Sequence, residues 1–163
     1  MDAVHLDAAL ERWLTRQPNL AISHCHVQIK LEHGDIAPAQ RATLDLPGWV
    51  LIDWGVRGTG LSAKRAMPAA GYLPTVGRLL EAIDSPLLRA HIQIVIAPAE
   101  DWNAAYSDAS LAPDLMPVID AGHATLLNLT AVREQGNWRV VRAYQPPSEN
   151  NIANEFRGVS GEL

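Results

Sequence analysis

Cysteine is almost absent from this chain, which contains only Cys25 among its 163 residues. A single cysteine excludes an intrachain disulfide, and one chain cannot supply the thiolate clusters that hold structural zinc. Chains without disulfides are typical of reducing compartments. We therefore expect a cytoplasmic protein whose fold depends on an apolar core.

Lysine is also scarce, since only Lys30 and Lys64 accompany eleven arginines. The thirteen basic side chains are outnumbered by eighteen acidic ones, which gives a formal net charge of −5. Acidic surfaces repel phosphate backbones and anionic lipid. We therefore expect neither nucleic acid nor a membrane as the partner.

Long apolar runs are missing as well. No segment approaches the roughly twenty apolar residues that span a bilayer. Residues 1–16 include three acidic side chains and lack the basic start and uninterrupted apolar stretch of a secretory signal. Both observations agree with the cytoplasmic expectation.

What is present indicates one packed domain. The hydrophobic fraction of 48% and the charged fraction of 19% are those of a globular protein. We predict a single α+β domain over residues 1–147 and a C-terminal tail over 148–163, with one short helix around 152–156.

Several segments alternate polar and apolar residues with the period of a strand. Segment 24–31 places Cys25, Val27, Ile29 and Leu31 on one face and His24, His26, Gln28 and Lys30 on the other. Segment 91–97 repeats this pattern, and segments 123–132 and 138–144 predict a hairpin. The run 49–56 is apolar on both faces apart from Asp53, which predicts a central strand.

Two segments have helical periodicity. Residues 3–16 place apolar side chains at Leu6, Leu10, Trp13 and Leu14, and a second helix follows Pro74 and ends before Pro86. Between the strands, residues 57–72 read as a long irregular loop. The order of elements predicts a single mostly antiparallel sheet of about five strands with two main helices packed on one face.

Four histidines are candidate metal ligands: His24, His26, His91 and His123. Neutral imidazoles bind zinc and related metals, and two of them on one strand can share an ion. No aspartate or glutamate lies at the spacing that would complete a known metal-binding motif. The favoured interpretation is therefore a wet polar face beside Gln28, Lys30 and Gln93, without a metal or other cofactor.

Asp53 is a candidate acid or base because an unpaired carboxylate in an apolar strand is unfavourable. If the strands pair, Asp53 and His26 form a catalytic pair for proton transfer. The closing hairpin, which contains residues 136–141, is similar to the last strands of nuclear-transport-factor-2-like domains. This resemblance implies an enzyme with a cone-like pocket, although the second N-terminal helix of that family is missing here. The alternative places Asp53 at a strand end in a structural role.

The remaining candidates are binding residues. Arg57, Lys64 and Arg65 flank a glycine-rich stretch, 58–63, that resembles a phosphate-binding loop but also fits an ordinary surface loop. Trp102 and Tyr106 lie in irregular sequence, where aromatic side chains often bind partners.

The leading hypothesis is a small non-catalytic module that binds a protein partner or a small ligand through a sheet face and the loop at 57–72. The proton-transfer enzyme and the histidine-ligated metal protein stay open as alternatives. Homo-oligomerisation also stays open.

Overall fold

The computed structural model describes residues 3–17, 20–33, 49–53, 59–63, 66–69, 76–81, 87–102, 115–134 and 137–145. Its helical elements are α1 (Ala3–Thr15), η1 (Leu20–Ile22), α3 (Val76–Glu81), η4 (Ala99–Trp102) and α4 (Met116–Asp120). Its strands are β1 (Ser23–His33), β2 (Trp49–Asp53), β3 (Thr59–Ala63), β4 (Met67–Pro68), β5 (Leu87–Pro98), β6 (Thr125–Glu134) and β7 (Asn137–Tyr144). Within those ranges, no helix has the length and apolar character needed to cross a membrane.

Helix α1 forms where its apolar periodicity predicts it. Its inward stripe is fully or almost fully buried and consists of Leu6, Leu10, Trp13 and Leu14. At its C-terminal end, Thr15 Oγ1 and Gln17 Nε2 donate hydrogen bonds of 2.9 and 2.8 Å to backbone carbonyls of the last turns. These bonds satisfy acceptors that a helix end leaves without intrahelical partners.

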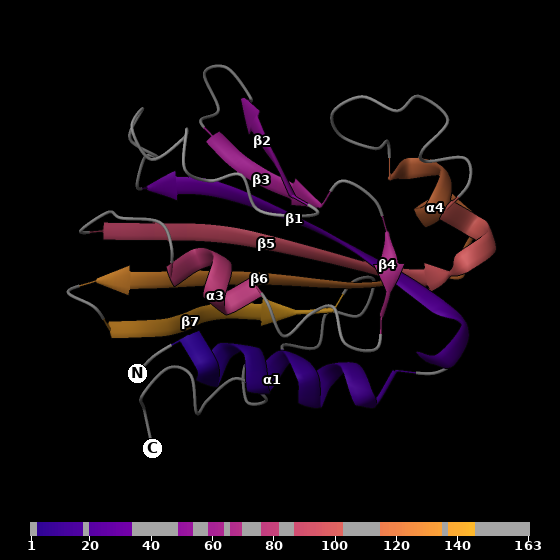
Figure 1. Ribbon diagram of the computed structural model, residues 1–163, viewed down its shortest axis with the longest axis horizontal. Coiled ribbons are helices and arrows are strands. Elements are labelled where there is room, and N and C mark those ends of the chain that lie inside the picture. Colours follow the sequence, from indigo (N-terminus) through magenta and orange to yellow (C-terminus); the bar gives the residue numbers. More distant parts are fainter. Residues whose placement is uncertain are drawn as a thin grey trace.

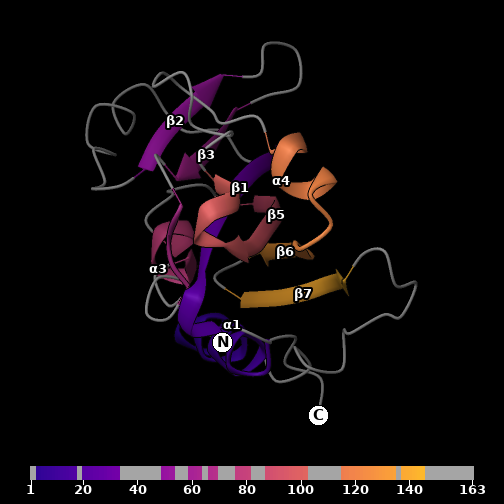
Figure 2. The ribbon, with the colours of Figure 1, turned by 90° about the vertical axis from the view of Figure 1, so that its right-hand side faces the viewer.

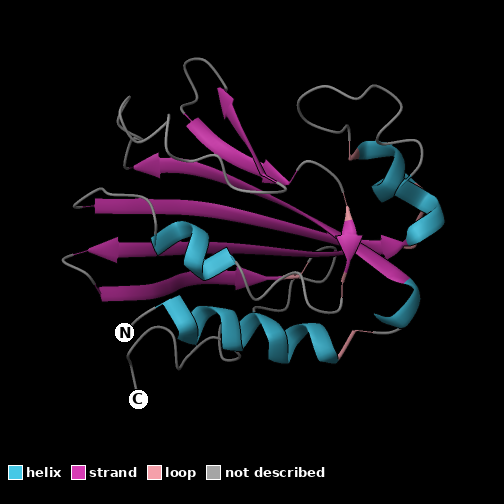
Figure 3. Ribbon diagram, viewed as in Figure 1, coloured by secondary structure: helices cyan, strands magenta, loops and turns pink. Residues whose placement is uncertain are grey.

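The strands form one antiparallel sheet (Figures 1 and 3). Six of its seven strands follow the order β2-β3-β1-β5-β6-β7, and the short β4 pairs with the beginning of β1. Strands β1 and β5 pair from Ser23 opposite Pro98 to His33 opposite Arg89, with one irregularity near the end of β1. The predicted hairpin is confirmed as β6 and β7.

The predicted central position of the apolar run at 49–56 is wrong. Strand β2 stands at the end of the strand order and pairs with β3, whereas β1 and β5 occupy the middle. An apolar run reports that both faces of a strand are covered, and it carries no information on how many strands pair with its edges.

The predicted long loop at 57–72 is also wrong in part, because it contains β3 and β4. Gly60 lies in β3, opposite Ile52 on one side and Lys30 on the other. The glycine-rich stretch is therefore partly strand, and its Gly60 to Ala63 portion does not form a phosphate-binding loop. The sequence obscured β3 because Leu61 is the only large apolar residue in it.

Two apolar clusters lie in the fold. The larger one combines buried residues of α1 and α3 with alternate residues of the strands, such as Ile29, Ile92 and Leu129. The smaller one combines Val95 and Ala97 of β5 with Trp102, Leu115 and Val118. Figure 2 shows α3 and α4 on opposite sides of the central strands. The smaller cluster therefore covers one end of the face that the larger cluster does not use.

Polar contacts fix α3 against its neighbours. The buried carboxylate of Asp7, on α1, accepts a hydrogen bond of 2.6 Å from the backbone N–H of Gly77. The buried guanidinium of Arg133, on β6, donates to the carbonyl of Leu80 at 3.2 Å. A charged partner thus meets the backbone near each end of this short helix.

Helix α4 ends with a glycine in the left-handed region. Gly122 has φ of 81° and its N–H donates to the carbonyl of Ile119 at 3.1 Å. Glycine adopts this conformation without the steric penalty of a side chain. The turn directs the chain from α4 into β6.

The predicted fold class is confirmed at the level of an α+β arrangement with a mostly antiparallel sheet. The sheet has seven strands rather than about five, since β3 and β4 add to the expected set. The predicted tail at 148–163 lies outside the described residues.

Candidate ligand-binding site

Two rows of polar residues cross four neighbouring strands of the sheet. The first row consists of register partners on β1, β5, β6 and β7, namely Lys30, His91, Thr130 and Arg142. The second row lies two residues along the strands and consists of Gln28, Gln93, Asn128 and Tyr144. These positions alternate with core residues, so the polar rows face away from the larger cluster.

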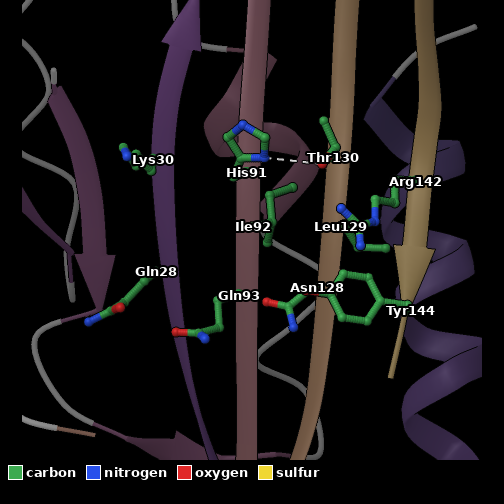
Figure 4. A pocket seen from close by; sticks show the side chains of 10 residues that line it. All are labelled: Gln28, Lys30, His91, Ile92, Gln93, Asn128, Leu129, Thr130, Arg142 and Tyr144. Atoms are coloured by element: carbon green, nitrogen blue, oxygen red, sulfur yellow. Dashed lines mark hydrogen bonds between the residues drawn. The ribbon is translucent and has the colours of Figure 1, made fainter. Parts of the chain in front are cut away.

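These eight polar residues line a pocket of about 290 Å³ (Figure 4). Ile92 and Leu129 complete its lining. Six of the eight polar residues are buried or half-buried, and only Lys30 and Arg142 are exposed. Thr130 is only 6% exposed. The rows therefore form a hollow rather than a flat wet surface, and we call this hollow the polar pocket.

One contact within the first row and one between the two rows orient the side chains. His91 Nδ1 lies 3.1 Å from Thr130 Oγ1, a hydrogen bond in which either group can donate, depending on the imidazole tautomer. Arg142 Cζ lies 4.4 Å from the centre of the Tyr144 ring. In Figure 4 both of these β7 side chains extend back toward β6. They form one side of the polar pocket.

The charge of the polar pocket is opposite to that of the chain. Its lining contains Lys30 and Arg142 and, among the described residues, no carboxylate, although the formal net charge of the protein is −5. The amides of the second row supply both donors and acceptors. The pocket can therefore bind a polar molecule through charge and through neutral hydrogen bonds.

The four candidate imidazoles do not converge. His26 is opposite Val95, four residues along β5 from His91, which is roughly 13 Å at the usual rise of a strand. His123 lies before β6, where its Nδ1 is 3.1 Å from Asp101 Oδ2. No group of three or more histidine, cysteine, aspartate or glutamate side chains among the described residues could hold a metal ion.

His26 does not lie on a wet face as expected. It is fully buried, and its ring centroid is 6.0 Å from that of Trp102. Burial lowers the pKa of His26 to about 4, because the interior penalises the charged imidazolium. The prediction failed because η4 and α4 cover this end of the polar face, which strand periodicity cannot reveal. His24, two residues earlier, is half-buried.

The register does not bring Asp53 and His26 together. Asp53 is the last residue of β2 and is opposite Thr59, and β3 separates β2 from β1. Through β3, Asp53 shares the row of Leu31, five residues along β1 from His26. The two Cα atoms are therefore separated by roughly 17 Å along the strands and about 10 Å across them. The side chain of Asp53 lies outside the described part of the structure.

The candidate Trp102 and the single cysteine are both core residues. Trp102 is 3% exposed, and its Nε1 donates to the carbonyls of His24 and Ala97, each at 3.2 Å. Cys25 is fully buried, and burial raises the pKa of its thiol to about 12. Neither side chain is available at the surface. The other binding candidates, Arg57, Lys64, Arg65 and Tyr106, lie outside the described residues.

Sequence reasoning found half of the polar pocket. It placed His91 beside Gln28, Lys30 and Gln93 on one polar face, and it predicted the hairpin without assigning a role to its polar side chains. Asn128 and Thr130 could have been found from their alternation with Leu127 and Leu129. Arg142 and Tyr144 could not, because an irregularity between β6 and β7 shifts the register beside Thr130.

Comparison of the chain with protein-family models, with curated proteins and with solved structures found no significant match.

Proposed function

We propose that this protein is a non-catalytic binding module whose polar pocket holds a small polar ligand. The observation that carries this proposal is the convergence of eight polar side chains from four strands on one hollow. A volume of about 290 Å³ is at the lower end of the range for small-molecule sites. In this proposal, α1 and α3 cover the face of the sheet opposite the polar pocket.

A flat solvated face is the alternative to a binding site, and the burial of the lining argues against it. Thr130, Asn128 and Gln93 are buried or half-buried, although they belong to the face away from the larger core. Polar groups in a hollow lose part of their contact with bulk water. A bound ligand can therefore replace water as their hydrogen-bond partner. This arrangement supports ligand binding better than it supports a structural role.

The proton-transfer alternative receives no support, because β3 stands between the strands that carry Asp53 and His26. A protein partner would need a broad contact surface, whereas the polar pocket has the size of a small ligand. We also propose a cytoplasmic location, which the buried thiol of Cys25 and the absence of any second cysteine support. Cell fractionation would contradict this location if the protein were recovered outside the cytoplasm.

The test is a screen of small polar compounds against the ¹⁵N-labelled full chain. We expect ligands to shift the side-chain amide resonances of Gln28, Gln93 and Asn128. Gln93→Ala should weaken binding by about three- to tenfold, whereas the matched change Gln17→Ala, at the end of α1, should leave it intact. Hits that shift only resonances outside the polar pocket would refute the proposal, as would a screen in which no compound shifts these amides.

A further inference from the structure

We infer that the ligand of the polar pocket carries an anionic group, a carboxylate or a phosphate, held between Lys30 and Arg142. This inference rests on the proposed function and names the ligand class of the same pocket. The two cations stand at opposite ends of one row, with His91 and Thr130 between them. Three strand spacings separate the ends, roughly 14 Å between Cα atoms. An anion over the middle of the row has a positive charge on each side.

Among the side chains that the structure describes, no carboxylate pairs with the two cations of the polar pocket. Within the described part of the chain, neither Lys30 nor Arg142 forms an ion pair. By contrast, Arg139 on the same strand β7 lies 4.0 Å from Glu134. Like charges lining one hollow raise the local concentration of ions of the opposite sign. The pocket is therefore suited to an anion, although the formal net charge of the protein is −5.

The guanidinium of Arg142 is held for recognition of an anion. Its Cζ lies 4.4 Å from the centre of the Tyr144 ring, and Figure 4 shows the side chain extending from β7 toward the middle of the pocket. Contact with an aromatic ring restrains a guanidinium and leaves N–H donors at its edge for other partners. Those donors match the paired oxygens of a carboxylate or phosphate.

The second row extends recognition beyond the charge. Gln28, Gln93 and Asn128 lie two residues along their strands from the first row, which is about 7 Å. Their amides offer neutral donors and acceptors at that distance from the cations. The arrangement therefore selects a small organic anion with a polar neutral portion in preference to a bare inorganic ion.

The experiment compares two anions with neutral analogues of similar shape. Glutaramate, the monoamide of glutarate, is compared with the diamide glutaramide, and glucose 6-phosphate with glucose, by ¹⁵N chemical-shift titration of the full chain at low salt. At least one anion should bind about ten- to a hundredfold more tightly than its neutral partner, as expected for hydrogen bonds to a charged group. The pair that shows this difference identifies the carboxylate or the phosphate as the preferred group.

Three variants assign the effect to the polar pocket. Arg142→Gln and Lys30→Gln should each weaken binding of that anion by about tenfold or more. The matched control Arg139→Gln removes an exposed arginine from the same strand and should change affinity by no more than about twofold. Circular dichroism must show that each variant retains the native fold.

Each remaining outcome decides the question. If the neutral analogues bind as tightly as the anions and shift Gln93 and Asn128, the inference fails and the proposed function stands. If Arg139→Gln weakens binding as much as Arg142→Gln does, the attraction is general and the inference fails. If none of the four probes binds, the inference also fails, and the broader screen then decides separately whether the proposed function fails.

Discussion

Acidification from pH 7 to pH 5 should destabilise this protein by about 2 kcal/mol through His26 alone. Burial lowers the pKa of this imidazole from 6.5 to about 4 in the folded protein. Between these values the unfolded chain binds a proton that the folded chain does not bind. The contribution of His26 is therefore fully present above pH 6.5 and is lost as the pH falls toward 4. The complete loss is about 3 kcal/mol at 1.36 kcal/mol per pH unit.

The assay is urea unfolding followed by tryptophan fluorescence at pH 7, 6 and 5. The free energy of unfolding is compared for the original protein, His26→Leu and His123→Gln. Between pH 7 and pH 5, the original protein should lose about 2 kcal/mol more than His26→Leu loses. His123→Gln is the control for removing a histidine outside the core, because the His123 side chain is 64% exposed.

Comparing pH differences removes any constant effect of the leucine on packing. If the original protein and His26→Leu lose the same free energy within about 0.5 kcal/mol, the reasoning about burial is wrong. An NMR titration of the His26 ring provides a second measurement that does not require the variant to fold. A midpoint near 6.5 would contradict the structural account directly.

Three further predictions concern stability and reactivity. Asp7→Ala should lower the free energy of unfolding by about 1.5 to 3 kcal/mol, because the Gly77 N–H loses a charged acceptor. The control Glu11→Ala, on the exposed face of α1, should change it by less than about 0.5 kcal/mol. Equal losses in urea unfolding would show that the contact between Asp7 and α3 is not stabilising. Gly122→Ala should lower it by about 1 to 2 kcal/mol, since its φ of 81° strains an alanine, and an unchanged melting temperature would argue against this turn. Cys25 should resist iodoacetamide at pH 8 in the folded protein and react once the chain unfolds in urea; rapid labelling of the folded protein would contradict its burial.

The fold could be predicted where local periodicity determines structure. The stripe that includes Leu6 and Trp13 defines α1, and the alternation around Val27 defines β1, because these patterns report which side chains meet the core. The order of strands could not be predicted in the same way. The position of β2 at the end of the sheet depends on its pairing with β3, and residues distant in sequence decide that pairing.

In the candidate site, too, some features follow from the local pattern and others depend on tertiary contacts. Gln28 and Gln93 could be placed on one face from alternation alone. Their joining with Asn128 required the register between β5 and β6, and the burial of His26 required the covering by η4 and α4. The pairing of Asp53 with His26 assumed that their strands were neighbours, whereas β3 stands between those strands. The local sequence pattern determines which face of the sheet a residue occupies, whereas tertiary contacts determine which residues surround it.

The interleaving of pocket and core on the same strands has a consequence for how this protein can diversify. Gln93 lies between Ile92 and Ile94 in the chain, yet its side chain belongs to the opposite side of the sheet. Substitutions in the polar rows can therefore alter what the molecule recognises while its packing stays intact. A few substitutions at every second position of these strands can therefore change the preferred ligand while the fold is retained.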